Sequence, residues 1–127
     1  MRKYAILKEA VYRDGDTDSD LVKKIMIYYE KEGDVYLFFY TTVDEYGSCC
    51  TDYFFNNLED ADEYAFSEYG LKSEDWILID DPLPFCQHDI IHPIRVKGRN
   101  TGKLVWDELE IFDGTKWVDF DKNRIVR

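Results

Sequence analysis

The chain has 127 residues, of which 27 are Asp or Glu and 16 are Lys or Arg, so its formal net charge at pH 7 is −11. Hydrophobic residues make up 45% of the sequence and aromatic residues 17%, which is more apolar content than a disordered acidic segment carries. These figures predict one folded domain spanning residues 1–127, with a strongly negative surface. Such a surface repels polyanions and therefore disfavours nucleic acid and anionic membranes as direct ligands.

Targeting signals and cysteine usage set the expected compartment. The longest apolar run, residues 35–40, has the length of a strand and falls well short of the roughly 20 residues that a membrane helix needs. The N-terminal stretch is interrupted by Lys8 and Glu9 before it could form the apolar core of a signal peptide. Three cysteines are too few, and odd in number, for a disulfide framework. We therefore expect a cytoplasmic protein with reduced thiols.

Four apolar stretches in the first half predict strands of an antiparallel meander. Two of them, residues 25–29 and 35–40, are apolar on both faces and are expected to pair as central strands. The connecting residues, Lys31-Glu32-Gly33-Asp34, include the glycine that a tight hairpin turn needs. The other two stretches, residues 2–13 and 48–55, alternate along the chain and extend the same sheet.

Residues 58–69 carry the signals of an α-helix at both ends. Asn57 is a preferred N-cap residue, acidic residues fill the first turn, and Gly70 follows the last turn. Apolar residues recur at helical spacing: Leu58, Ala61, Ala65 and Tyr69. Carboxylates occupy the outer surface without a Lys or Arg among them: Glu59, Asp60, Asp62, Glu63 and Glu68. The helix is therefore expected to present an anionic stripe to solvent.

The second half predicts shorter strands around an irregular segment. Residues 76–79 read as a short strand, and the prolines that follow predict irregular structure over residues 80–93. Asp113-Gly114 is a favoured turn dipeptide for a hairpin. Further strands are expected at residues 95–97, 104–112 and 116–120. The predicted fold class is α+β, a predominantly antiparallel β-sheet with one principal α-helix packed on one face.

Both histidines of the chain fall in one segment with a cysteine and an aspartate: Cys86, His88, Asp89 and His92. Thiolate, imidazole and carboxylate are ligands that Zn²⁺ accepts, so this segment is a candidate zinc site, although its spacing matches no standard zinc motif. A second hypothesis has a histidine activate the thiol of Cys86 as a nucleophile, although no glycine-rich turn adjoins it to supply an oxyanion site. In a third interpretation, the polar residues bond the loop backbone and the cysteine packs as a small hydrophobic residue.

No signature of a known catalytic mechanism is present, so no catalytic residues are predicted. The excess of acids, together with many aromatic residues, instead favours a small acidic protein-binding domain whose partner is a basic protein. An inhibitor or immunity-type protein that neutralises a basic toxin or nuclease has this general character. A rival hypothesis is a homo-oligomeric structural protein that uses its surplus aromatic residues for self-association.

The expected contacts with a basic partner are two acidic groups and two aromatic anchors. The acids would supply long-range attraction and salt bridges: Asp14, Asp16, Asp18, Asp20, Glu59, Asp62, Glu63 and Glu68. Tyr46 and Tyr64 are expected to be the anchors, because a tyrosine contributes a large contact area at modest entropic cost.

Overall fold

The computed structural model describes residues 1–30 and 33–127; Lys31 and Glu32, on which the predicted hairpin turn partly falls, lie outside the described residues. Mostly antiparallel strands in two sheets and an α-helix confirm the α+β class. The strands and the helix are β1 (Arg2–Tyr12), β2 (Leu21–Tyr29), β3 (Val35–Tyr40), β4 (Thr51–Phe55), α1 (Leu58–Tyr69), β5 (Ile77–Ile79), β6 (Ile94–Val96), β7 (Leu109–Phe112) and β8 (Trp117–Phe120). No helix within the described residues is long and apolar enough to cross a membrane.

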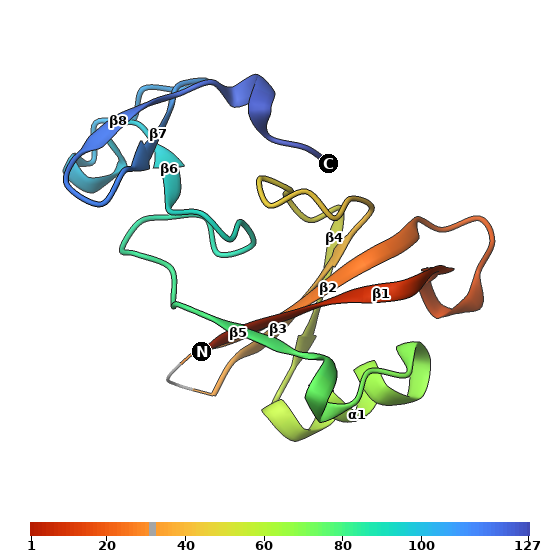
Figure 1. Cartoon of the computed structure of the whole chain (residues 1–127). Helices are drawn as coiled ribbons and strands as arrows, with labels where there is room; N and C mark the ends of the chain where they lie inside the picture. The colour runs from red at the N-terminus through yellow and green to blue at the C-terminus, as the bar shows by residue number, and fades with distance from the viewer. Residues whose placement is uncertain (31–32) are drawn as a thin grey trace.

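The first sheet has five strands in the order β4-β3-β2-β1-β5 (Figure 1). The predicted pairing of the two central strands is confirmed, with Ile27 opposite Leu37 and Met26 opposite Phe38. Strand β1 therefore lies inside the sheet, paired with β2 on one side and with the much later β5 on the other. This arrangement leaves β4 and β5 as the two edge strands.

Alternate residues of the central strands belong to different clusters on the two faces of this sheet. On one face, the buried residues Ile25, Leu37 and Phe39 form a cluster that also contains Ala61 and Ala65 of α1. We call this the α1 face. The other face is centred on Met26, Phe38 and Tyr40, with Ile91 of the irregular segment packed against them. We call this the loop face.

Helix α1 has the bounds expected from its end signals. The side-chain oxygen of Asn57 accepts a hydrogen bond from the backbone N–H of Asp60 at 2.8 Å, which satisfies a free donor of the first turn. At the other end, Gly70 adopts the left-handed conformation with φ of 68°, which other residues rarely adopt. Between these caps, Ala61 and Ala65 are fully buried. Both belong to the buried cluster that also contains Ile25, Leu37 and Phe39 of the central strands.

The predicted irregular segment, residues 80–93, is held on the loop face by the buried side chain of Arg2, which is 3% exposed. Its guanidinium donates hydrogen bonds to the carbonyl oxygens of Asp80, His88 and Ile90 at 2.8, 3.0 and 2.8 Å. A buried arginine needs such acceptors, because an unpaired charge in a protein interior is costly. One residue at the start of β1 thereby orders a segment about eighty positions later in the chain.

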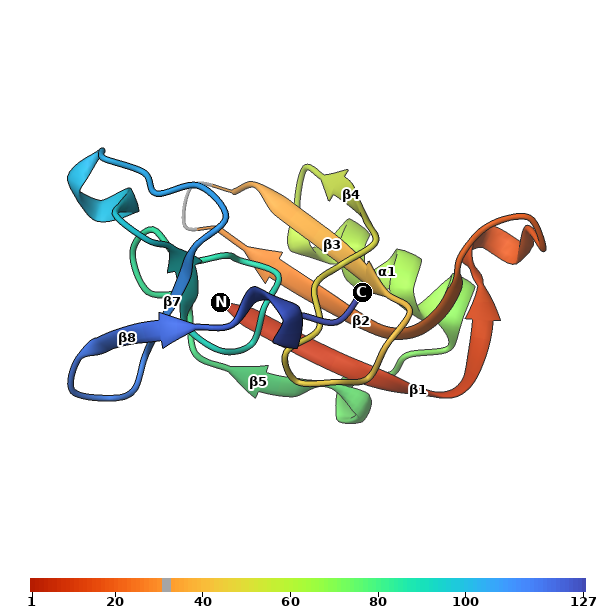
Figure 2. The ribbon, with the colours of Figure 1, turned by 90° about the horizontal axis from the view of Figure 1, so that it is seen from above.

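The C-terminal strands form a separate sheet in the order β6-β7-β8, and Figure 2 shows β7 and β8 outside the five-stranded sheet. One face of this sheet contributes Ile94 and Phe120 to a cluster with Ile90. On the other face, Arg95 pairs with Glu110 at 2.7 Å and lies over the ring of Trp117. The two sheets share no paired strands within the described residues, but a backbone bridge joins Gly47, in the connection between β3 and β4, to Val126 near the C-terminus.

Candidate functional site

A groove of about 630 Å³ lies between the two sheets and contains three of the four candidate metal ligands, Cys86, His88 and Asp89. Its wall on the loop face comes from Tyr36 and Phe38, and the second sheet contributes aliphatic side chains. The side chain of Cys49 also lines it. The fold thus brings Cys49, from the region before β4, to the segment that the sequence marked as a candidate zinc site.

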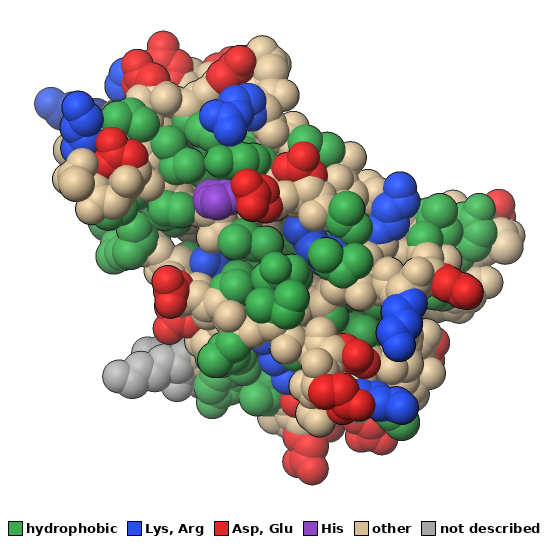
Figure 3. Space-filling view, in the orientation of Figure 1, with side chains coloured by type: hydrophobic (Ala, Val, Ile, Leu, Met, Phe, Trp, Pro, Cys, Tyr) green, Lys and Arg blue, Asp and Glu red, His purple; other side chains and the backbone are tan. Residues whose placement is uncertain are grey.

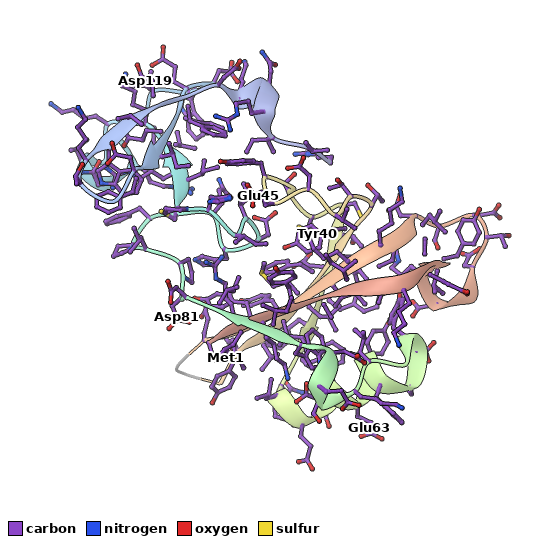
Figure 4. The ribbon with its side chains drawn as sticks, viewed as in Figure 1. Met1, Tyr40, Glu45, Glu63, Asp81 and Asp119 are labelled. Carbon is purple, nitrogen blue, oxygen red and sulfur yellow. The ribbon has the colours of Figure 1, made fainter. Side chains whose placement is uncertain are left out.

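The polar groups in and near the groove are hydrogen-bonded to one another. The carboxylate of Asp89 accepts a hydrogen bond from the backbone N–H of Cys49 at 2.8 Å, and the backbone carbonyl of Asp89 accepts one from the hydroxyl of Tyr40. Figure 4 labels Tyr40, the last residue of β3. Burial, reinforced by the adjacent Asp89 carboxylate, raises the pKa of the Cys49 thiol to about 12, and burial also raises the pKa of Cys86. Both thiols are therefore held in the protonated, weakly nucleophilic form.

The side chains of the two histidines lie in different surroundings. His88 packs on Tyr28 with ring centroids 4.8 Å apart, and His92 stacks on Tyr46 with centroids 4.4 Å apart. His92 Nε2 lies 3.5 Å from a carboxylate oxygen of Glu45 without forming a hydrogen bond. Across residues 1–30 and 33–127, no three His, Cys, Asp and Glu side chains are grouped to hold a metal ion. The candidate zinc ligands are neighbours in sequence, but the fold does not converge their side chains.

The acidic loop between β1 and β2 is connected to α1 through Asp14. Its carboxylate accepts hydrogen bonds from the hydroxyls of Tyr53 and Tyr64, and these bonds lower the pKa of Asp14. Burial and the bond to Asp14 raise the pKa of Tyr64. Asp14 itself has a φ of 53°, a left-handed conformation that aspartate tolerates better than most residues. The loop and the helix that carry the two acidic groups expected from the sequence are thus joined at Asp14.

The remaining predicted acids divide into those with internal partners and those without. Asp16 accepts a hydrogen bond from the backbone N–H of Asp18, Asp20 lies 3.7 Å from Arg13, and Asp62 pairs with Lys3 at 2.6 Å. The other predicted acids are exposed, with no ion pair or hydrogen bond from their carboxylates in the described part of the chain: Asp18, Glu59, Glu63 and Glu68. Figure 3 shows carboxylates with scattered lysine and arginine side chains over the lower part of the molecule, where α1 lies.

The two predicted aromatic anchors are both partly buried. Tyr64 packs edge-on against Phe39 and donates its hydroxyl proton to Asp14. Tyr46 stacks on His92 and Phe120, and the guanidinium of Arg124 lies over its ring at 4.6 Å. Each ring thus joins parts of the fold, Tyr64 the helix to the acidic loop and Tyr46 the first sheet's connecting loop to the second sheet.

Sequence reasoning missed a second hollow, of about 640 Å³, between α1 and β5. Its most exposed apolar side chains are Phe66 at 56% and Leu78 at 71%. In the sequence, Phe66 lies four residues after Asp62 and therefore on the edge of the acidic surface rather than on the apolar side of the helix. A phenylalanine at that position, among carboxylates, was the sequence signal that could have indicated the hollow.

No protein-family model matches this chain, and no significant match was found among curated proteins or solved structures.

Proposed function

We propose that this protein binds a basic protein through a surface formed by the acidic loop and α1. We call this surface the acidic face, and it comprises Asp14, Asp16, Asp18, Asp20, Glu59, Asp62, Glu63 and Glu68. The observation that carries the proposal is the hydrogen bond between Asp14 of the loop and Tyr64 of α1, because it joins the loop that carries one acidic group to the helix that carries the other. A continuous anionic surface attracts a cationic partner over a longer range than isolated carboxylates do.

Unpaired carboxylates on this surface support the proposal further. Glu63 and Glu68 are exposed and have no cationic partner within the described residues, so their charge is available to another molecule. Figure 4 labels Glu63 on the outer side of α1, away from the sheet. Apolar area at Phe66, next to these acids, supplies the desolvated contact that attraction alone does not provide.

An inhibitor or immunity-type protein is the form of this function that fits best. Such a protein covers a cationic surface that its target needs for binding nucleic acid, and a strongly negative domain makes that encounter fast. The three free thiols are consistent with an encounter in the cytoplasm. The thiol-dependent alternative is disfavoured by the raised pKa values of Cys49 and Cys86.

The test is affinity capture from lysate of the host cell with three tagged proteins, followed by elution with a salt gradient and mass spectrometry. The test variant, Glu63→Lys with Glu68→Lys, reverses two unpaired charges and avoids the first helical turn, where a carboxylate stabilises the helix. The control variant, Asp34→Lys with Asp52→Lys, makes the same change in net charge at two exposed carboxylates, of which Asp52 lies opposite Phe38 of the loop face. Both variants are checked for unchanged folding by circular dichroism.

We expect the native protein and the control to capture the same basic protein in a stoichiometric amount, released as salt rises. The test variant should capture at least about tenfold less of it, because charge reversal on an interface slows association and weakens binding. Equal capture by the test variant and the control would overturn the proposal. So would the stoichiometric capture of an acidic or neutral protein whose release does not depend on salt.

A further inference from the structure

The edge strand β5 lacks the usual protection against pairing with another strand. It pairs with β1 on one side, and within the part of the chain described by the structure no strand lies on its other side. Figure 2 shows β5 along the outer border of the sheet. Edge strands are usually protected by a lysine, a proline or a bulge, but β5 consists of Ile77, Leu78 and Ile79. Its short length protects it, and the exposed Asp80 and Asp81 and then Pro82 limit the free edge after Ile79.

The exposed side chains of β5 make both faces of this edge apolar. Ile77 is 50% exposed and Leu78 is 71% exposed, and consecutive strand residues point to opposite faces. Leu78 borders the hollow beside α1, whose other apolar walls are Phe66, Leu71 and Trp76. A strand added to this edge would therefore have backbone partners along β5 and a place for one of its side chains in the hollow.

The lining of the hollow itself holds two lysines, Lys3 and Lys72, and two carboxylates, Asp62 and Glu63, but the excess of negative charge in the surrounding segment favours a cationic occupant. Residues 58–76 carry a single cation, Lys72, against seven carboxylates: Glu59, Asp60, Asp62, Glu63, Glu68, Glu74 and Asp75. The second lysine of the hollow, Lys3, is already paired with Asp62 and lies over the ring of Trp76 at 4.7 Å. A second copy of this chain is a poor occupant, because each copy carries a formal charge of −11 and pairing at β5 would bring the two acidic surfaces together.

We propose that an extended, cationic segment of a protein adds a strand to the free edge of β5, placing an apolar side chain in the hollow against Phe66 and Leu78 and a lysine or arginine beside Glu63. This inference rests on the proposed function, since it identifies the part of the basic partner that the acidic face recognises. Backbone pairing supplies affinity in this mode of recognition, and the hollow and Glu63 supply selectivity.

The test uses a synthetic ten-residue peptide of alternating lysine and valine as the probe. Binding is followed by NMR through the amide signals of the labelled protein, and a second peptide carries backbone N-methyl groups at alternate residues to remove its hydrogen-bond donors. The variant Leu78→Lys places a charge on the β5 edge, and Phe54→Lys is its matched control on β4, the opposite edge strand, where Phe54 is similarly exposed. Phe66→Ala independently removes a wall of the hollow.

We expect saturable shifts centred on the amides of residues 77–79, loss of binding by the N-methylated peptide, and affinity lowered at least about tenfold by Leu78→Lys but not by Phe54→Lys. Phe66→Ala should weaken binding more moderately. Shifts centred on β4, or equal binding of the two peptides, would overturn the proposal.

The charge-reversed variant Glu63→Lys with Glu68→Lys separates this proposal from the one on which it rests. If it loses the basic protein in lysate capture and Leu78→Lys does not, the acidic face remains the binding surface and strand addition at β5 is wrong. If neither variant loses the captured protein, both proposals are wrong.

Discussion

The two faces of the five-stranded sheet are covered in different ways. On the α1 face, a regular helix contributes small apolar side chains such as Ala61 and Ala65 to a cluster of aliphatic and aromatic residues. On the loop face, irregular backbone is held by buried polar groups, chiefly Arg2, Tyr40 and Asp89. Irregular backbone cannot satisfy its own carbonyl groups, so its burial needs donors from elsewhere in the chain. The covering of the α1 face is thus held by the volume and shape of apolar side chains, whereas the covering of the loop face is held by hydrogen bonds.

The largest effect should come from removing the donor that holds the irregular segment. We expect Arg2→Ala to lower the free energy of unfolding by about 3–5 kcal/mol, because several buried carbonyl oxygens lose their partner at once. Urea unfolding measures the loss, and hydrogen exchange should show the amides of residues 80–93 deprotected before those of α1. Arg99→Ala, at an exposed arginine, is the control. A change below about 1 kcal/mol would show that the loop face does not depend on this side chain.

On the α1 face, we expect the free energy of unfolding to depend on side-chain volume. Ala65 is fully buried, so Ala65→Leu should cost about 1–3 kcal/mol by forcing the helix away from the sheet. Ser67→Leu adds a similar side chain at an exposed position of the same helix and should change stability little. Thermal unfolding followed by circular dichroism compares the two. Equal stabilities would mean that α1 can shift without loss, contrary to close packing at this face.

A smaller effect is expected from a single hydrogen bond on the loop face. Tyr40→Phe keeps the ring and removes the hydroxyl that bonds the carbonyl of Asp89, which should cost about 1–2 kcal/mol. Tyr12→Phe, at an exposed tyrosine of β1, serves as the control in the same urea titration. If the two variants were equally stable, the bond to Asp89 would contribute nothing net to the closure of this face.

The smallest effect is a pH dependence that arises from the loop face. The pKa of the Cys49 thiol is raised from 9.0 to about 12. The thiol's contribution to stability is therefore fully present below pH 9 and is lost as the pH rises from 9 to about 12. We expect Cys49→Ala to reduce the loss of stability at alkaline pH by roughly a few tenths of a kcal/mol per pH unit. A single fully coupled proton would change stability by ~1.4 kcal/mol per pH unit. Urea titrations across this pH range measure it. Cys50→Ala, at an exposed thiol, should flatten the loss less, and the reverse order would contradict this assignment.

This contrast explains which parts of the fold could be predicted from the sequence. The bounds of α1 and β3 were predicted correctly, because caps and apolar runs are local signals. Strand β7 begins only at Leu109 rather than at residue 104, and Asp107 just before it has a φ of 66°. The second sheet forms by pairing of residues that are not close in sequence, such as Arg95 of β6 with Glu110 of β7, and neither spacing nor composition records such pairing.

Candidate sites were predicted less well, for a related reason. The sequence grouped the acids by their positions along the chain, but it could not show that Asp14 is bonded to Tyr53 and Tyr64, whose positions lie some forty to fifty residues later. Nor could it show that His88 and His92 face different aromatic rings. A contact between distant residues carries no local pattern, so only the arrangement of the strands reveals it.

The interior position of β1 also sets the order in which the chain can fold. Strands β1 to β4 are joined by short connections, so this meander can form early, whereas Lys3 meets Leu78 of β5 only by closing a long loop of chain. We therefore expect β5 and the irregular segment to join last and, in the native state, to open first as one cooperative unit. The edge proposed to accept a partner strand would then be the least stable part of the sheet, and a bound strand would slow its opening.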